Sequence, residues 1–304
     1  MDRIAIAVPC QCVWAGPLAP ASVREALEAL PAEAQRAQRA GARLLEFPAE
    51  LAVVNPEYMG RKFWADAARV LDGEGLGATA HLPLHWVDLA ALDRAVWEGS
   101  IRSVRLALEA TEPLQALMAV VHPTSFVSEA LLLHAPAERA LGLAMALAER
   151  LVEALQTLMR EGGAGVEHLA LENLEGIPMD LFLQLVEMGG VKACLDLGHA
   201  VSNGEDPLEA FRTLSEAGKL AGLHLHDAVP AMSLETSGPA PSFSPSPFPP
   251  AIGRAHLPLG EGRLDLGGLI TKVNQTRFEG PIVLEVDGGS YPSLAHFLHL
   301  VEAR

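Results

Sequence analysis

Short apolar runs alternate along the chain with longer stretches in which apolar residues recur at the spacing of an α-helix. The short runs predict buried β-strands. They are IAIAVP (4–9), RLLEFP (43–48), GATAHLPL (77–84), LMAVVHP (117–123), HLALENL (168–174), VKACLDLGH (191–199), AGLHLHDA (221–228) and PIVLEVDG (281–288). The longer stretches predict helices over residues 56–72, 89–110, 137–160, 179–188, 207–218 and 293–303. A first helix is expected from near Ser22, where Glu25 completes a capping box, to Gly41.

This alternation predicts a parallel α/β fold, and eight strands are the number that closes a (β/α)8 TIM barrel. An open doubly wound sheet would usually carry a glycine-rich turn after its first strand, and VPCQCVWAGP has no such motif. We therefore expect a single barrel domain over residues 1–304. Residues 229–253 break the rhythm with seven prolines and five serines. This segment follows the seventh strand, so we interpret it as a mobile loop, and as a lid if it closes over the mouth of the barrel.

Half of the residues are hydrophobic and 20% are charged, as expected of a globular protein with a large core. The net charge is −16. The negative charge disfavours DNA as a partner, because nucleic-acid-binding proteins usually present a basic stripe. No apolar run reaches the roughly 20 residues that span a bilayer, so no membrane partner is expected. The N-terminal MDRIAIAVP does not resemble a signal peptide, and Cys10, Cys12 and Cys194 are expected to be free thiols. Together these features predict a cytoplasmic protein.

Polar residues end nearly every predicted strand, and barrel enzymes place their chemistry at this end. These residues are Glu46, His81, His122, Glu172, Asp196, His199, His224, His226, Asp227 and Glu285. Each could be a packed or loop-bonded side chain when taken singly. Because so many occur at one end of one barrel, we interpret the set as a site for a divalent cation.

The chemistry of such a site can be derived from its residue types. A cation bound by Glu172, Asp196, His224 and Glu285 would polarise a carbonyl or hydroxyl oxygen of a substrate. A carboxylate at its edge could then remove a proton from the carbon beside the carbonyl. Mixed oxygen and nitrogen ligands suit manganese, zinc, magnesium or cobalt, and the sequence does not choose among them.

The ordered motifs LALENLEG, CLDLGHA, LHLHDA, HLPLGEG and IVLEV resemble the xylose isomerase-like TIM barrel superfamily over nearly the whole chain. Its sugar phosphate isomerase/epimerase branch implies one metal ion held by the four residues named above. In that branch the two glutamates, Glu172 and Glu285, also act as acid and base. The resemblance further implies substrate contacts, which we assign to His199, Arg254, His256 and Glu46.

The endonuclease IV branch of the same superfamily, an AP endonuclease family acting on abasic DNA, implies three zinc ions. His81 and His122 would bind a second ion together with Glu172. The third ion would take His199, His256 and an aspartate two residues before that histidine, where this chain has Arg254. A positive side chain is a poor neighbour for zinc, so we expect the isomerase branch and keep the nuclease as the alternative. A barrel that only binds a small ligand, and assembly into a homo-oligomer, are also left open.

Overall fold

Eight parallel strands close a barrel in a computed structural model that describes residues 5–14, 20–125, 128, 137–230, 254–287 and 289–303. The strand order around the barrel is β1-β10-β7-β6-β5-β4-β3-β2, so each strand pairs with its predecessor among the barrel strands. The barrel strands are β1 (Ala5–Pro9), β2 (Leu44–Pro48), β3 (Gly77–His81), β4 (Ala119–Val121), β5 (Leu169–Glu172), β6 (Lys192–Asp196), β7 (Leu220–Leu225) and β10 (Pro281–Leu284). The predicted (β/α)8 barrel is thus confirmed, with every barrel strand at its predicted place.

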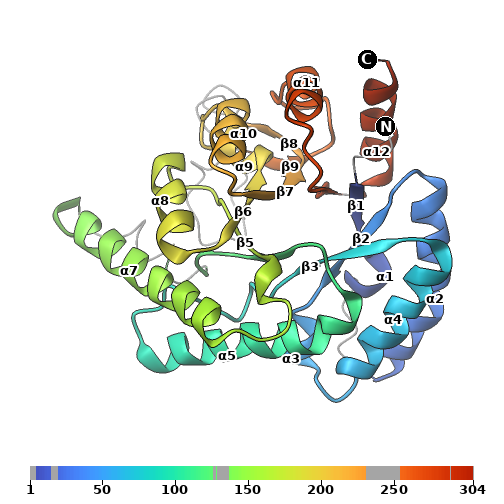
Figure 1. Cartoon of the computed structure of the whole chain (residues 1–304), viewed down its shortest axis with the longest axis horizontal. Coiled ribbons are helices and arrows are strands. Elements are labelled where there is room, and N and C mark those ends of the chain that lie inside the picture. Colours follow the sequence, from blue (N-terminus) through green and yellow to red (C-terminus); the bar gives the residue numbers. More distant parts are fainter. Residues whose placement is uncertain are drawn as a thin grey trace, which may run out of the picture.

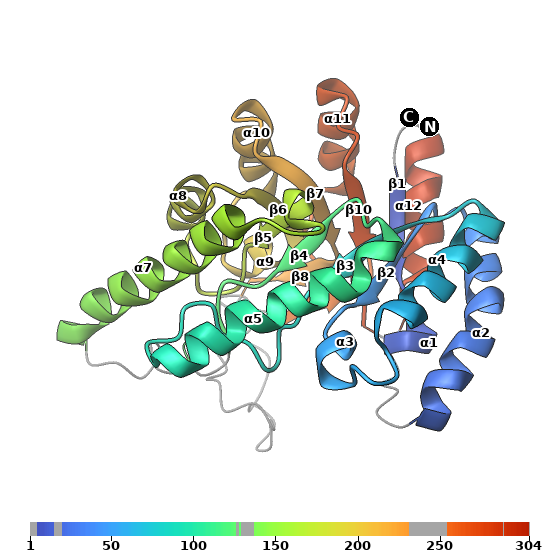
Figure 2. The ribbon, with the colours of Figure 1, turned by 60° about the horizontal axis from the view of Figure 1, so that its bottom comes forward.

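Helices surround the strands (Figure 1). They are α1 (Gln11–Trp14), α2 (Pro20–Arg39), α3 (Leu51–Val54), α4 (Arg61–Glu74), α5 (Arg94–Thr111), α7 (Ala137–Glu161), α8 (Met179–Gly189), α9 (Leu197–Ser202), α10 (Pro207–Glu216), α11 (Leu266–Thr276) and α12 (Tyr291–Glu302), with short 3-10 turns at Glu112–Leu114 and Val166–His168. The turned view shows α5 and α7 alongside each other (Figure 2), where Trp97 Nε1 donates to the Arg150 carbonyl oxygen at 3.0 Å. Among the described residues, no helix combines the length and the apolar character needed to cross a membrane.

The structure differs from the predicted elements mainly around the sixth and seventh strands. The predicted sixth strand, 191–199, ends at Asp196, because the Asp196 side chain accepts the backbone N–H of His199 at 2.7 Å and starts α9. The predicted seventh strand divides into β7 and a short β8 (Asp227–Val229), which pairs antiparallel with β9 (Arg254–Leu257) outside the barrel. Helix α11 was not predicted. The predicted mobile loop 229–253 lies, from residue 231 onward, outside the described residues, so the lid remains a prediction.

The inside of the barrel is apolar at one level and polar at the next. A separate buried cluster of residues on or beside the strands consists of Ala7, Leu44, Met118, Val120, Ala170, Cys194 and Val283. Side chains alternate between the two faces of a strand, so the residue two positions later also faces the interior. Counting two positions on from Leu44, Val120, Ala170, Cys194 and Val283 gives Glu46, His122, Glu172, Asp196 and Glu285. The strand period therefore places the polar residues together, one layer above an apolar floor.

Strand β7 follows the same rule, with a glycine in the apolar layer. Gly222 precedes His224 by two positions, and a Cβ on Gly222 would lie 2.4 Å from Met118 Sδ and 3.0 Å from the Pro281 carbonyl oxygen. Met118 thus occupies the space that a β7 side chain would need. A larger apolar core, which includes Phe47, Trp64 and Phe211, packs between the strands and the surrounding helices and keeps the polar layer in position.

Candidate metal centre

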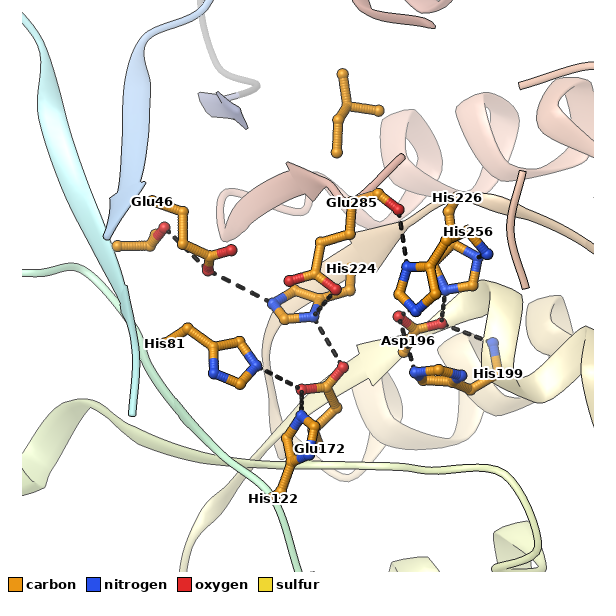
Figure 3. A network of polar contacts seen from close by, with 12 residues as sticks. Glu46, His81, His122, Glu172, Asp196, His199, His224, His226, His256 and Glu285 are labelled. Atoms are coloured by element: carbon orange, nitrogen blue, oxygen red, sulfur yellow. Dashed lines mark hydrogen bonds and ion pairs between the residues drawn. The ribbon is translucent and has the colours of Figure 1, made fainter. Parts of the chain in front are cut away.

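His224 lies at the middle of the polar layer and faces three carboxylates (Figure 3). Its Nδ1 is 2.8 Å from Glu172 Oε1 and 3.3 Å from Glu285 Oε2. On the other side of the ring, Nε2 is 3.6 Å from Glu46 Oε1. His224, Glu46 and Glu172 are at most 1% exposed, so these charges interact with little screening by water. The imidazole of β7 therefore contacts side chains from β2, from β5 and from the residue that follows β10.

Asp196 stands beside this group at the end of β6, and its backbone is fixed by a residue that follows β5. The Asn173 side chain donates to the Asp196 carbonyl oxygen at 2.9 Å and accepts the Asp196 backbone N–H at 2.7 Å. Glu172, Asp196, His224 and Glu285 each present one ligand atom, and these atoms lie within 4.8 Å of one another. The structure thus brings together the four residues predicted to hold a metal ion.

A second group shares Glu172 with the first. Glu172 Oε2 is 3.1 Å from His122 Nε2 and 3.5 Å from His81 Nε2, and the rings of His81 and His122 meet edge to face with centroids 4.9 Å apart. The predicted pair for a second ion is therefore adjacent to the central group, with the two oxygens of Glu172 turned toward different partners.

A third group contains only histidines: His199 from α9, His226 after β7 and His256 from β9. Its ligand atoms also lie within 4.8 Å of one another, and Asp196 of the central group faces two of its rings. Asp196 Oδ1 is 3.0 Å from His226 Nε2, and Asp196 Oδ2 is 3.7 Å from His199 Nε2. Glu175 Oε1 lies 2.6 Å from the other nitrogen of His199, Nδ1.

The carboxylates of the centre are held in their ionised form. Burial raises the pKa of Glu172, but the positive charges of His224 and His122 outweigh it and hold the pKa well below its usual value. Glu285 behaves in the same way, with His224 as the main cause that lowers its pKa. Burial raises the pKa of Glu46 despite the His224 charge nearby, so this carboxyl is the one that binds a proton more readily.

The pKa values of most histidines in the centre are raised, whereas those of Glu172 and Glu285 are lowered. Burial lowers the pKa of His81 and His199, but neighbouring carboxylates outweigh it and raise these pKa values to about 9 and about 10. The pKa of His224 is raised well above its usual value by Cys194, Glu172 and Glu285 acting against burial. His122 differs, because burial dominates and lowers its pKa. The carboxylates give the cluster an excess of negative charge, and protons bound to the histidines balance it. A bound cation could balance this charge instead.

The donor atoms of these residues fit a divalent ion. Within the described part of the chain, Glu172 Oε2, Glu46 Oε2 and His224 Nε2 are buried without a hydrogen bond. Buried polar atoms normally have such partners, so these three atoms mark polar groups that the side chains of the centre leave unsatisfied. Carboxylate and imidazole are donors that manganese, zinc and cobalt accept. The four central residues would hold the ion.

The predicted substrate contacts lie in different surroundings. His199 is buried, His256 is half-buried, and Arg254 is exposed at the start of β9. Glu46 is fully buried and faces Thr79 Oγ1 at 3.3 Å as well as His224. Asp227, which was predicted among the polar strand ends, accepts hydrogen bonds from backbone N–H groups alone as far as the described residues go, and we interpret it as structural.

Three residues of the centre were not assigned a role from the sequence: His226, Asn173 and Glu175. His226 carried a signal, since it stands two positions after His224 and strand alternation favours the same face. Asn173 and Glu175 lie in the turn after β5, where no periodicity predicts the direction of a side chain. Their contacts with Asp196 and His199 depend on how β5 and β6 pair.

A closed parallel barrel with acidic and histidine side chains at the carboxyl ends of its strands defines a TIM barrel with a candidate metal centre. The family model of the xylose isomerase-like TIM barrels matches residues 34–299, and the chain belongs to this family. A comparison with curated proteins gave no significant match.

Solved structures with the same fold include a D-tagatose 3-epimerase-like protein, which is 16% identical with a TM-score of 0.67 over 99% of both chains. A xylose isomerase domain protein from Planctomyces limnophilus is 16% identical, with a TM-score of 0.64 over 99% of this chain and 95% of the other. D-allulose 3-epimerase from Methylomonas sp. is 17% identical, with a TM-score of 0.61 over 98% of this chain and 90% of the other. At these identities the likeness establishes the fold.

Proposed function

We propose that this chain is a metal-dependent isomerase or epimerase of a sugar or sugar phosphate. The observation that carries the proposal is the convergence of Glu172, Asp196, His224 and Glu285 on one position, with both glutamates against the same imidazole nitrogen. Structural neighbours that include a D-allulose 3-epimerase support the substrate class. We further propose that the whole chain forms one barrel domain, located in the cytoplasm. Its assembly state stays open.

The chain's own residues supply the proton transfer. Glu172 and Glu285 are both ionised, so either can take the proton from the sugar carbon next to the carbonyl. Return of a proton to the opposite face of that carbon gives the epimer, and return to the neighbouring carbon gives the isomer. A divalent manganese, zinc, magnesium or cobalt ion in the centre would polarise the sugar's oxygen atoms and favour loss of the adjacent proton.

Other residues orient the substrate in this proposal. Arg254 is exposed, and its guanidinium can bind a phosphate or a hydroxyl group of the sugar. His199 and His256 offer ring nitrogens at the edge of the centre. Because Glu46 is fully buried against His224, we assign it the role of positioning this imidazole rather than direct contact with substrate.

Solvent exchange tests the proposed function. The purified protein with a divalent ion is incubated in D2O with a panel of ketoses and their phosphates, and NMR follows deuterium entering the carbon beside the carbonyl. Glu285→Gln and Glu172→Gln should each lower the exchange by about 10²- to 10⁴-fold, because they remove an acid–base group. Glu50→Gln, which affects a carboxylate paired with the exposed His85, is the matched control. Exchange at the wild-type rate in Glu285→Gln, or no exchange with any sugar, would refute the proposal.

The endonuclease IV-like activity remains the second candidate, because the structure groups His81 and His122 with Glu172 as that branch requires. The net charge of −16 speaks against DNA as the substrate. An oligonucleotide duplex with one abasic site distinguishes the two: metal-dependent cleavage beside that site, with no sugar exchange, would favour the nuclease.

A further inference from the structure

Two cysteines lie against each other just past the end of β1. Cys10 directly follows β1 and Cys12 lies in α1, and their sulfur atoms are 3.6 Å apart. The third cysteine of the chain, Cys194, is on β6 in the apolar floor of the barrel. At 3.6 Å no other atom fits between the two sulfur atoms, so a small movement of the side chains would bring them to bonding distance.

The backbone holds Cys10 and Cys12 at a spacing that a disulfide can span. The chain turns at Cys10, because its carbonyl oxygen accepts the backbone N–H of Val13 at 3.0 Å. In a helical turn, Cα atoms two positions apart lie about 5.4 Å from each other. Disulfides join residues whose Cα atoms are roughly 4.4 to 6.8 Å apart. Rotation of the two side chains can therefore close the bond without a change of fold.

The two thiols have different surroundings. Cys10 is fully buried, whereas Cys12 is half-buried. Burial raises the pKa of the Cys10 thiol well above its usual value. With the Cys10 thiol as donor, the hydrogen bond between the sulfur atoms lowers the pKa of Cys12, and this outweighs burial and the negative charge of Glu33. The thiolate is the reactive form of cysteine, so Cys12 is suited to attack and Cys10 to complete the bond.

A backbone hydrogen bond connects the cysteine pair to β2. The N–H group of Cys10 donates to the Glu46 carbonyl oxygen at 2.8 Å, which extends the pairing of β1 with β2 by one residue. The side chain of Glu46 faces His224 in the polar layer. Cys10 and Cys12 therefore lie at the end of the barrel that carries the polar side chains, but neither belongs to the three groups that could hold a metal ion.

We propose that Cys10 and Cys12 form a reversible intramolecular disulfide when the protein is exposed to hydrogen peroxide. The Cys12 thiolate attacks one peroxide oxygen, so that an S–O bond forms, the O–O bond breaks, and the departing hydroxide is protonated to water. The Cys10 sulfur then attacks the Cys12 sulfur. The S–S bond forms, the S–O bond breaks, and the second hydroxide takes the Cys10 proton. Two thiols thus lose two electrons and two protons, and the peroxide becomes two water molecules.

Thiol counting on the full chain tests the disulfide. The reduced protein is treated with hydrogen peroxide, unfolded in the presence of an alkylating agent and analysed by mass spectrometry. The number of alkylated cysteines should fall from three to one. The tryptic peptide of residues 4–24 contains both Cys10 and Cys12 and should become lighter by two hydrogen atoms. Reduced glutathione should restore all three thiols, because the half-buried Cys12 sulfur is open to attack by another thiol.

Single variants assign the roles of the two cysteines. Cys10→Ser should leave Cys12 as a sulfenic acid that dimedone traps, because no thiol is present to displace the oxygen. Cys12→Ser should keep the Cys10 thiol under the same treatment, because Cys10 is buried. Cys194→Ala removes the cysteine outside the pair and should form the same disulfide as the wild type. Circular dichroism verifies the fold of each variant.

Two kinds of result would overturn the proposal, whether or not the protein epimerises sugars. Three alkylated cysteines in the peroxide-treated wild type would show that the pair does not react. A disulfide between two chains, or a sulfinic acid on Cys12 of the wild type, would show that Cys10 does not reach Cys12 in the folded protein.

Discussion

Glu46 Oε1 lies 3.6 Å from His224 Nε2, across the ring from the Nδ1 atom that faces Glu172 at 2.8 Å. A carboxylate in this place orients the imidazole and increases its basicity as a ligand. Glu46→Gln should therefore weaken metal binding at the central group by about 10- to 100-fold while the protein stays folded. Titration with manganese in a competing chelator measures the affinity.

Glu50→Gln is the control for this substitution, because Glu50 follows β2 but pairs with the half-exposed side chain of His85. Unchanged affinity in Glu46→Gln would show that Glu46 does not position His224. Wild-type metal affinity in Glu46→Asp would show that the negative charge at this position is what supports metal binding.

The metal-free protein should lose stability as the pH rises from about 6.5 toward 10. The pKa of His81 is raised from 6.5 to about 9 and that of His199 from 6.5 to about 10. A raised pKa contributes stability that is fully present below the unfolded value and is lost as the pH passes through the folded value. Thermal unfolding in the presence of a chelator, at intervals across this range, should give a falling midpoint.

A bound divalent ion should reverse this trend, because it replaces the protons that the histidines carry. Metal affinity should rise over the same pH range as those protons are released. A midpoint that is independent of pH in the metal-free protein would contradict the charge balance described for the centre. His299→Ala, at an exposed position, should follow the wild-type profile.

Asn173 links the ends of β5 and β6 through its two hydrogen bonds to the Asp196 backbone. Asn173→Asp keeps the shape but turns the donor toward the Asp196 carbonyl oxygen into an acceptor. We expect a loss of about 2 kcal/mol or more in the free energy of unfolding, because a buried carbonyl oxygen loses its partner. Metal affinity should fall as well, since Asp196 is a proposed ligand.

Urea unfolding of Asn173→Asp and of Asn203→Asp, with and without metal, measures both effects. Asn203 is half-buried in the neighbouring loop and donates to the Leu174 carbonyl oxygen at 3.2 Å, away from the centre. Asn203→Asp should reduce stability without changing metal affinity. Equal metal affinity in Asn173→Asp and the wild type would show that Asp196 is not placed by this pair.

The barrel could be predicted because its strands are buried on both faces and therefore appear in the sequence as short apolar runs. Between these runs, apolar residues recur at helical spacing. Five of the barrel strands also place a polar residue two positions after an interior apolar residue, as Ala170 and Glu172 show. Elements that depend on partners far along the chain were not predictable. Strand β9 forms by pairing with β8, so it does not follow from local pattern alone. Helix α9 begins at a local cap, Asp196, but this residue lies within the apolar run 191–199 that was predicted to be one strand.

The same distinction applies to the candidate site. Glu172, Asp196, His224 and Glu285 were assigned from their strand ends and from the family resemblance, and the structure brings them together. The place of Glu46 was less predictable, because a glutamate at the end of β2 could face substrate, a loop or another side chain. Only the closure of the barrel, which brings β2 and β7 across from each other, sets it against His224.

Asp227 is buried beside the candidate centre but serves the fold. Its carboxylate accepts the backbone N–H groups of Ala228, Gly260 and Leu264, each at 2.9 Å. A Cβ on Gly262 would lie 2.2 Å from Asp227 Oδ1, so the loop packs directly on this side chain. Asp227→Ala leaves three N–H groups without their acceptor and should cost about 3 kcal/mol or more in the free energy of unfolding. Asp265→Ala removes a single capping bond at the start of α11 and should cost only about 1 kcal/mol. Urea unfolding compares the two variants, and similar losses in both would show that the loop does not depend on Asp227.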